Sequence, residues 1–71
     1  MRENDNPFDY IYLKDHLARP IGIIPEMIAT IIPTKNPMQC LLWFEGEELP
    51  RLFNHSLYEV VAELDTFYNA N

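Results

Sequence analysis

Residues 38–53, MQCLLWFEGEELPRLF, decide the fold, because a buried strand, a polar turn and an extended return follow one another within this stretch. Residues 38–45 are rich in apolar and aromatic side chains and predict a strand. The strand is apolar on both faces over Cys40–Phe44, which is typical of the centre of a sheet. The glutamate-rich loop EGEELP follows, in which Gly46 permits a positive φ, and the chain then leaves in extended form.

The alternation of side chains along this strand predicts which of them reach the core. Successive side chains of a strand point to opposite faces of the sheet. Cys40, Leu42 and Phe44 are therefore expected in the core, and Leu41 and Trp43 on the other face. That second face is covered only if a helix or another chain lies on it. We expect Trp43 to be partly exposed in the monomer and to contact a partner.

The segment before this strand allows two interpretations. Pro25 suits the first position of a short helix, which the negative charge of Glu26 would favour at its N-terminus. The β-branched residues that follow favour a strand over residues 27–33 instead, and we prefer the strand. The turn-forming residues TKNP then join it to the central strand in antiparallel fashion.

The N-terminal part of the chain predicts a tail, a first strand and a polar connection. Residues 1–6 predict a flexible tail, and residues 7–71 a single small α+β domain. The aromatic and β-branched residues 8–13 predict a strand. In the polar connection KDHLARP that follows, Pro20 restricts Arg19 to extended geometry.

The C-terminal segment predicts an amphipathic helix over residues 57–68. Ser56 and Glu59 are spaced as a capping box, in which each side chain accepts a hydrogen bond from the backbone N–H of the other. Apolar residues then recur at helical spacing and form one stripe: Leu57, Val60, Val61, Leu64, Phe67 and Tyr68. We expect Leu64 in the core. The elements together predict an α+β fold, a small three-stranded antiparallel sheet with the C-terminal amphipathic helix packed on one face.

The sequence is acidic, since eleven Asp and Glu residues against five Lys and Arg residues give a formal net charge of −6. Nucleic-acid backbones and anionic lipids repel such a chain, so we expect no direct binding to nucleic acid or to a membrane. The basic residues are scattered along the chain: Arg2, Lys14, Arg19, Lys35 and Arg51. A basic surface on a larger protein is the complementary partner, and solubility alone is the alternative reason for the charge.

Candidate partner-binding residues gather at two places. The first patch combines an aromatic anchor with a charged rim, an arrangement that concentrates binding energy in interfaces. Its members are Trp43, Glu45, Glu47 and Glu48. The second place is the polar face of the predicted helix, where Glu59 and Glu63 stand one turn apart. These carboxylates either imitate the phosphates of a nucleic acid or only keep the protein soluble.

No catalytic residue, metal ligand or cofactor is predicted. His16 and His55 have no ligand-type spacing to each other or to Cys40, and the sequence has no phosphate-binding loop or nucleophile motif. Cys40 is the only cysteine, and its apolar neighbours predict a buried, unreactive thiol. We therefore expect a protein without enzymatic activity.

The sequence predicts a cytoplasmic protein. The first residues, MRENDNPFD, are polar and lack the apolar region of a signal peptide. The longest apolar stretch, residues 21–32, is interrupted by Gly22, Pro25 and Glu26 and is not expected to span a bilayer.

These features favour a small, acidic, non-enzymatic protein-binding module. It would dock on a basic surface of a larger protein and modulate or inhibit it, as a phage or mobile-element inhibitor of a nucleic-acid-binding enzyme would. The alternative is a small accessory subunit or a homo-oligomer, in the simplest case a homodimer, held by an apolar interface.

Overall fold

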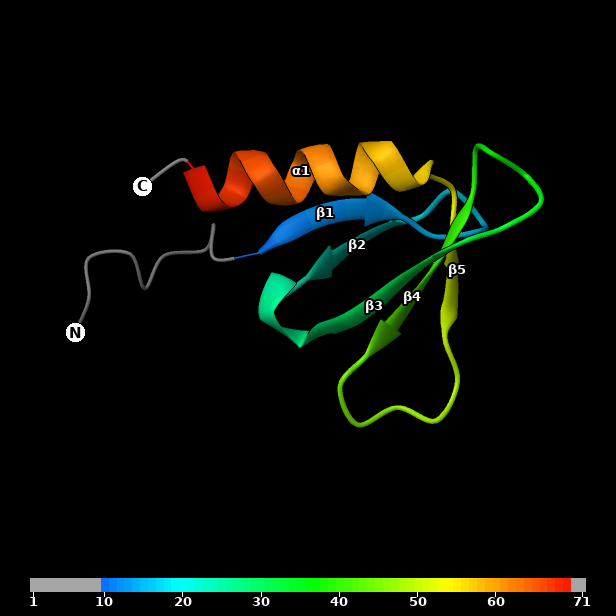
Figure 1. Cartoon of the computed structure of the whole chain (residues 1–71), viewed down its shortest axis with the longest axis horizontal. Helices are drawn as coiled ribbons and strands as arrows, with labels where there is room; N and C mark the ends of the chain where they lie inside the picture. Colours follow the sequence, from blue (N-terminus) through cyan, green and yellow to red (C-terminus); the bar gives the residue numbers. More distant parts are fainter. Residues whose placement is uncertain (1–9, 70–71) are drawn as a thin grey trace.

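The computed structural model describes residues 10–69, which form two small antiparallel sheets and a C-terminal helix (Figure 1). In chain order the elements are β1 (Ile11–Lys14), β2 (Pro20–Ile23), the 3₁₀ turn η1 (Pro25–Met27), β3 (Ile28–Pro33), β4 (Cys40–Phe44), β5 (Arg51–Phe53) and α1 (Leu57–Asn69). The predicted α+β fold with a three-stranded antiparallel sheet is confirmed. The predicted tail over residues 1–6 lies outside the described residues.

The three-stranded sheet has the order β3-β4-β5, with the predicted central strand in the middle. Ile31 pairs with Leu42, which pairs in turn with Arg51. The sequence analysis was wrong about the third strand of this sheet. We predicted the strand over residues 8–13, whereas the third strand is β5, which we had expected only as an extended exit. β5 has three residues, too few to show the alternation that identifies a strand.

The predicted first strand belongs to the second sheet. β1 pairs antiparallel with β2, from Ile11 opposite Ile23 to Lys14 opposite Pro20. The sequence analysis missed β2, because a four-residue strand that contains a proline and a glycine has a weak strand signal. Residues 8 and 9 of the predicted strand lie outside the described residues.

The turn between β1 and β2 is closed by hydrogen bonds and contains a strained residue. The Asp15 N–H donates to the Arg19 carbonyl (3.0 Å), and the Ala18 N–H donates to the Asp15 carbonyl (2.9 Å). Ala18 adopts a φ of 64°, in the left-handed region. A residue with a Cβ atom pays about 1–2 kcal/mol there, which is why glycine is the usual choice at this position of a three-residue hairpin loop.

The ambiguous segment before β3 contains both of the structures that we considered. Pro25 begins η1, in which the Met27 N–H donates to the Ile24 carbonyl (2.9 Å) and the Ile28 N–H to the Pro25 carbonyl. The strand starts directly afterwards, at Ile28 instead of the predicted residue 27. The preference for a strand is therefore confirmed, and only Pro25–Met27 adopt a helical conformation, as one 3₁₀ turn.

The core lies where both sheets meet α1. Its fully or almost fully buried apolar residues are Ile11, Leu13, Ile23, Cys40, Leu42, Phe53 and Val60. Cys40 and Leu42 are buried as predicted, whereas Phe44 is half-buried at the edge of the core. Leu64 is also only half-buried, because α1 directs Val60, and no other described helix residue, fully into the core.

The predicted capping box begins the helix. The Ser56 N–H donates to Glu59 Oε1 (3.0 Å), and the Glu59 N–H donates to Ser56 Oγ (3.1 Å). The helix that follows confirms the predicted residues 57–68 and extends one residue further. Figure 1 shows α1 along β1 on one side of the molecule, with the β4–β5 loop on the opposite side.

Substitution of Ala18 by glycine should stabilise the protein by about 0.5–1 kcal/mol, because glycine adopts the left-handed conformation without strain. Urea denaturation measures the change. Ala62→Gly, on the exposed side of α1, is the control and should destabilise by about 1 kcal/mol. Equal destabilisation by both substitutions would show that residue 18 is not left-handed.

Val60→Ala should lower the free energy of unfolding by about 2 kcal/mol, because it leaves a cavity beneath α1. Val61→Ala is the matched control, since Val61 lies on the same helix with 48% of its surface exposed and should cost less than about 0.5 kcal/mol. Thermal or urea denaturation compares the two variants. A larger loss for Val61→Ala would contradict the orientation of the helix.

Candidate protein-binding surface

The outer face of the three-stranded sheet displays Trp43. In the register of the sheet, Trp43 lies opposite Thr30, and Leu41 lies between Ile32 and Leu52. These side chains alternate with the core residues of β4 and point away from the core. Trp43 is 37% exposed, which confirms the predicted partial exposure. We call this outer surface the Trp43 face: Thr30, Ile32, Leu41, Trp43 and Leu52.

The β4–β5 loop holds the Trp43 ring in place. The indole Nε1–H of Trp43 donates to the carbonyl of Glu47 (2.8 Å). The loop itself is closed by the Glu47 N–H, which donates to the Phe44 carbonyl (3.1 Å), and Gly46 adopts a φ of 82° within the turn. Glycine adopts this backbone conformation without strain. The aromatic ring is thus fixed before any partner arrives, which lowers the entropic cost of binding.

The three loop glutamates have different roles. Glu47 forms a two-pronged ion pair with Arg51, whose Nε and Nη2 lie 3.0 and 2.6 Å from its two carboxylate oxygens. Arg51 also lies over the ring of Phe44, 5.6 Å from its centroid. Glu45 and Glu48 are exposed and make no ion pair with a lysine or arginine in the described part of the chain. The negative charge available to a partner here is therefore that of Glu45 and Glu48.

The two predicted helix glutamates lie elsewhere. Glu59 is occupied by the capping box, and its Oε1 lies 3.4 Å from His55 Nδ1. Glu63 is exposed on α1. Because α1 and the β4–β5 loop lie on opposite sides of the molecule (Figure 1), the six predicted residues do not form one continuous surface. Trp43, Glu45 and Glu48 share one end of the molecule.

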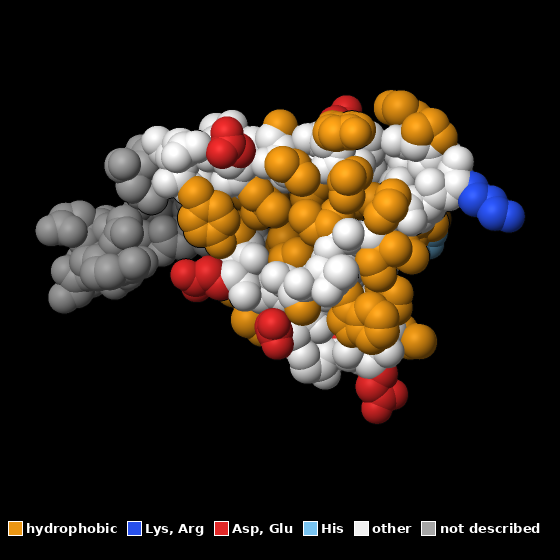
Figure 2. Space-filling view, in the orientation of Figure 1, with side chains coloured by type: hydrophobic (Ala, Val, Ile, Leu, Met, Phe, Trp, Pro, Cys, Tyr) orange, Lys and Arg blue, Asp and Glu red, His pale blue; other side chains and the backbone are white. Residues whose placement is uncertain are grey.

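A groove between α1 and β3 is the feature that the sequence analysis missed. It has a volume of about 550 Å³ and is lined mainly by apolar residues, together with Thr30: Pro25, Ile28, Ala29, Ile31, Leu57, Val61, Leu64 and Tyr68. In Figure 2 hydrophobic side chains form a broad area between the helix and the sheet, with acidic side chains around it. The sequence carried no signal for it, because the six apolar residues form one stripe of ordinary width and only the packing of the sheets decides which of them stay uncovered.

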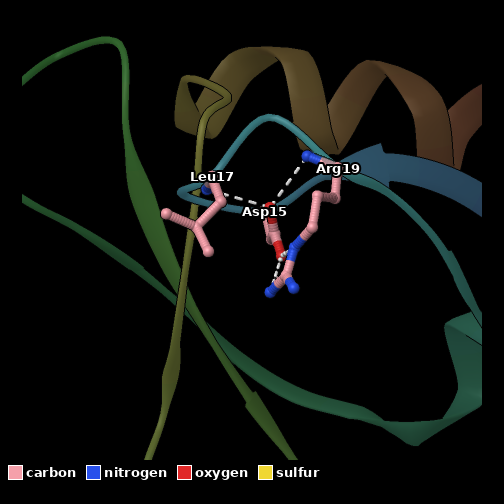
Figure 3. Close-up of polar contacts among 3 residues, drawn as sticks. All are labelled: Asp15, Leu17 and Arg19. Carbon is pink, nitrogen blue, oxygen red and sulfur yellow. Dashed lines mark hydrogen bonds and ion pairs between the residues drawn. The ribbon is translucent and has the colours of Figure 1, made fainter.

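Asp15 is a buried carboxylate with a structural role (Figure 3). Its Oδ1 accepts hydrogen bonds from the N–H groups of Leu17 and Arg19, both at 2.9 Å. Its Oδ2 accepts a hydrogen bond from Nε of Arg19 (2.9 Å) and forms an ion pair with Nη2 of the same side chain (2.8 Å). The backbone N–H of Arg19 contributes most to a lowered pKa of Asp15, and together with the side chain of Arg19 and the N–H of Leu17 it outweighs the opposing effect of burial. A carboxylate held ionised by donors within its own turn closes the hairpin and is unsuited to proton transfer.

His55 also has a structural role. Its Nε2 accepts a hydrogen bond from the Lys14 N–H (2.8 Å), while the Lys14 carbonyl accepts one from the Asn54 N–H (2.9 Å). These bonds attach the end of β1 to the segment between β5 and α1. Asp15 and Phe53 form an isolated bridge at the same place. We call this junction of the two sheets the Asp15–His55 joint: Lys14, Asp15, Phe53, Asn54 and His55.

The described residues offer little to a metal or a nucleophilic reaction. No three His, Cys, Asp or Glu side chains among residues 10–69 are grouped so that they could bind a metal ion. Cys40 is fully buried, as predicted. Burial, with a smaller contribution from the negative charge of Glu59, raises the pKa of its thiol. The thiolate that nucleophilic chemistry requires is therefore disfavoured.

Within the described part of the chain, no helix combines the length and the apolar character needed to cross a bilayer. Comparison with protein-family models, with curated proteins and with solved structures finds no match for this chain.

Asp15→Asn should destabilise the protein at neutral pH, and the difference from the wild type should shrink in acid. Because the native pKa of Asp15 lies below the ordinary value of about 3.9, the unfolded chain binds the proton more tightly. The stabilisation is therefore fully present above that ordinary value and is lost as the pH falls through the lowered native pKa.

Urea denaturation between about pH 6 and pH 2 measures this difference. Glu48→Gln, at an exposed loop position, is the control and should match the wild type throughout. A gap between wild type and Asp15→Asn that stays constant down to the lowest pH would contradict the role assigned to the carboxylate.

Proposed function

We propose that this chain is a small non-enzymatic protein-binding module that docks on a basic surface of a larger protein and modulates or inhibits it. The observation that carries the proposal is the fixed, partly exposed ring of Trp43 beside the exposed carboxylates of Glu45 and Glu48. An aromatic side chain surrounded by a polar rim is the usual centre of a protein interface.

The charges that remain after internal pairing support a basic partner. Arg19 and Arg51 are paired with Asp15 and Glu47, so that they contribute little net positive charge to the surface. Carboxylates on the loop and on α1 then dominate the electrostatic field. Such a field attracts proteins that normally bind nucleic acid, and we infer inhibition of a nucleic-acid-binding enzyme of phage or mobile-element context as the specific role. The free thiol of Cys40 suits the reducing cytoplasm, where we place this activity.

The second candidate function is a small accessory subunit or homo-oligomer held by an apolar interface. The groove between α1 and β3 favours it, because apolar side chains are exposed there. Ionic strength separates the two candidates. A complex guided by charge associates more slowly at high salt, whereas an apolar interface is nearly insensitive.

The experiment is capture of partners by the tagged chain from a lysate of its host, at about 0.1 and 0.5 M salt, followed by kinetics with the purified partner. The Glu45→Gln/Glu48→Gln variant should keep its melting temperature, because exposed charges alter stability by less than about 0.5 kcal/mol. It should associate about tenfold more slowly at low salt, and high salt should remove most of the difference.

Trp43→Ala should mainly accelerate dissociation, since it removes the aromatic anchor. Glu63→Gln, which removes one charge from α1, is the comparison and should have a smaller effect than either change at the loop. If the association rate of the partner changes neither with salt nor with loss of the loop carboxylates, the charge-guided module is overturned and the apolar alternative is favoured.

A further inference from the structure

Part of the apolar stripe of α1 is not covered by the sheets. Val60 faces the core and Phe67 lies against it, whereas Val61 and Tyr68 are 48% and 54% exposed. Val61 and Tyr68 lie on the same side of the helix as Leu57, and all three line the groove beside β3. β3 is the last strand on this side of the three-stranded sheet, and the exposed part of the apolar stripe faces the groove beside it.

β3 is an edge strand at the border of this groove. Among the described residues it pairs with β4 only. On an antiparallel edge strand every second residue directs its N–H and C=O away from the neighbour, where they are free to bind another strand. Edge strands are often protected by a charged side chain, a proline or a bulge. β3 has no charged side chain and carries the other two devices only near its ends. An irregularity at Ala29 and the residue Pro33 border its open stretch.

We propose that the groove between α1 and β3 binds an extended segment of the partner, which adds to the sheet as a further strand beside β3. This inference rests on the proposed binding function and specifies how the partner is held. An added strand lies about 4.7–4.9 Å from its neighbour and presents alternate side chains to opposite faces. One set would fill the groove against Leu57, Val61 and Tyr68, and the other would extend the Trp43 face next to Thr30.

Charge and hydrophobicity define the segment that fits. The groove is lined by uncharged residues, so the side chains directed toward α1 are apolar. Asp65 stands one helical turn from Val61 and Tyr68, and Glu26 precedes β3 within η1. Lysine or arginine flanks on the incoming strand would meet these carboxylates. Residues 1–9 of this chain, MRENDNPFD, are acidic and lack alternating apolar residues, and a second copy brings a further charge of −6. A basic, alternating segment of another protein fits best.

The test uses the full-length chain labelled with ¹⁵N and the synthetic peptide acetyl-KKVTVTVKK-amide as the probe. Addition to β3 should shift the backbone amide signals of β3 and the signals of Val61 and Tyr68, and should slow hydrogen exchange at β3. The sharpest control is a pair of N-methylated peptides. In one, the methyl groups replace the N–H hydrogens on one hydrogen-bonding edge of the extended peptide, and in the other they replace those on the opposite edge. Methylation of the edge that faces β3 should abolish binding, whereas methylation of the other edge should leave it within about twofold.

Two matched changes examine the groove and its charge. Val61→Asp should weaken the binding of the peptide by at least about tenfold, while Ala62→Asp, with the same added charge outside the groove, should not. Replacement of the flanking lysines of the peptide by glutamate should weaken binding at low salt. Before titration, light scattering measures the mass of the free chain.

The proposal is overturned if the unmethylated peptide does not bind, if both methylated peptides bind alike, or if Val61→Asp and Ala62→Asp have equal effects. A free chain that is dimeric, and becomes monomeric on Val61→Asp, would assign the groove to a second copy and would also overturn it. Salt-sensitive capture of a basic partner without peptide binding would leave the proposed function standing and remove only the added strand. Peptide binding without any basic partner would leave the added strand standing and remove the proposed function.

Discussion

The Asp15–His55 joint fixes how the two sheets meet, and the position of the helix depends on it. The carboxylate of Asp15 closes the β1–β2 turn, while the backbone of Lys14 is bonded to Asn54 and to the His55 ring. The chain enters α1 directly after this point, so the joint sets where the helix begins. Val60 then reaches a core to which each sheet contributes. The joint is polar, and it needs its full set of hydrogen bonds because a buried carboxylate without donors would be destabilising.

The sequence predicted those elements whose signal is local and repeated. The helix and its capping box were predicted because Ser56, Glu59 and a long apolar period agree with each other. The alternation along β4 correctly separated Cys40 and Leu42 from the exposed Trp43. β2 and β5 could not be predicted, because strands of three or four residues are too short to show an alternation and β2 also contains a proline and a glycine. The turn at Ala18 was equally hidden, since alanine gives no indication of a left-handed backbone.

The candidate site was predicted only in part. Glu45 and Glu48 are available to a partner, as expected from their place in a loop. Glu47 and Glu59 are instead bound within the fold, by Arg51 and by the helix cap. The role of Glu59 follows from the capping box that the sequence predicts, whereas the pairing of Glu47 with Arg51 depends on how the loop folds. The groove depends on which part of the apolar stripe the sheet covers, and that follows from tertiary packing alone.

Solubility and the proposed recognition of a basic partner are not exclusive reasons for the acidic charge, because one electrostatic field serves both. The chain exposes Val61, Tyr68 and Trp43, and β3 is an open edge among the described residues. These are features that promote association between identical molecules. Copies that each carry a charge of −6 repel one another, which opposes such self-association. In the function that we propose, the same field attracts a basic protein to the same surfaces. In the proposed complex, the acidic surface around an uncharged groove selects the occupant by the charge of its flanks, and a buried charge in the groove is unnecessary.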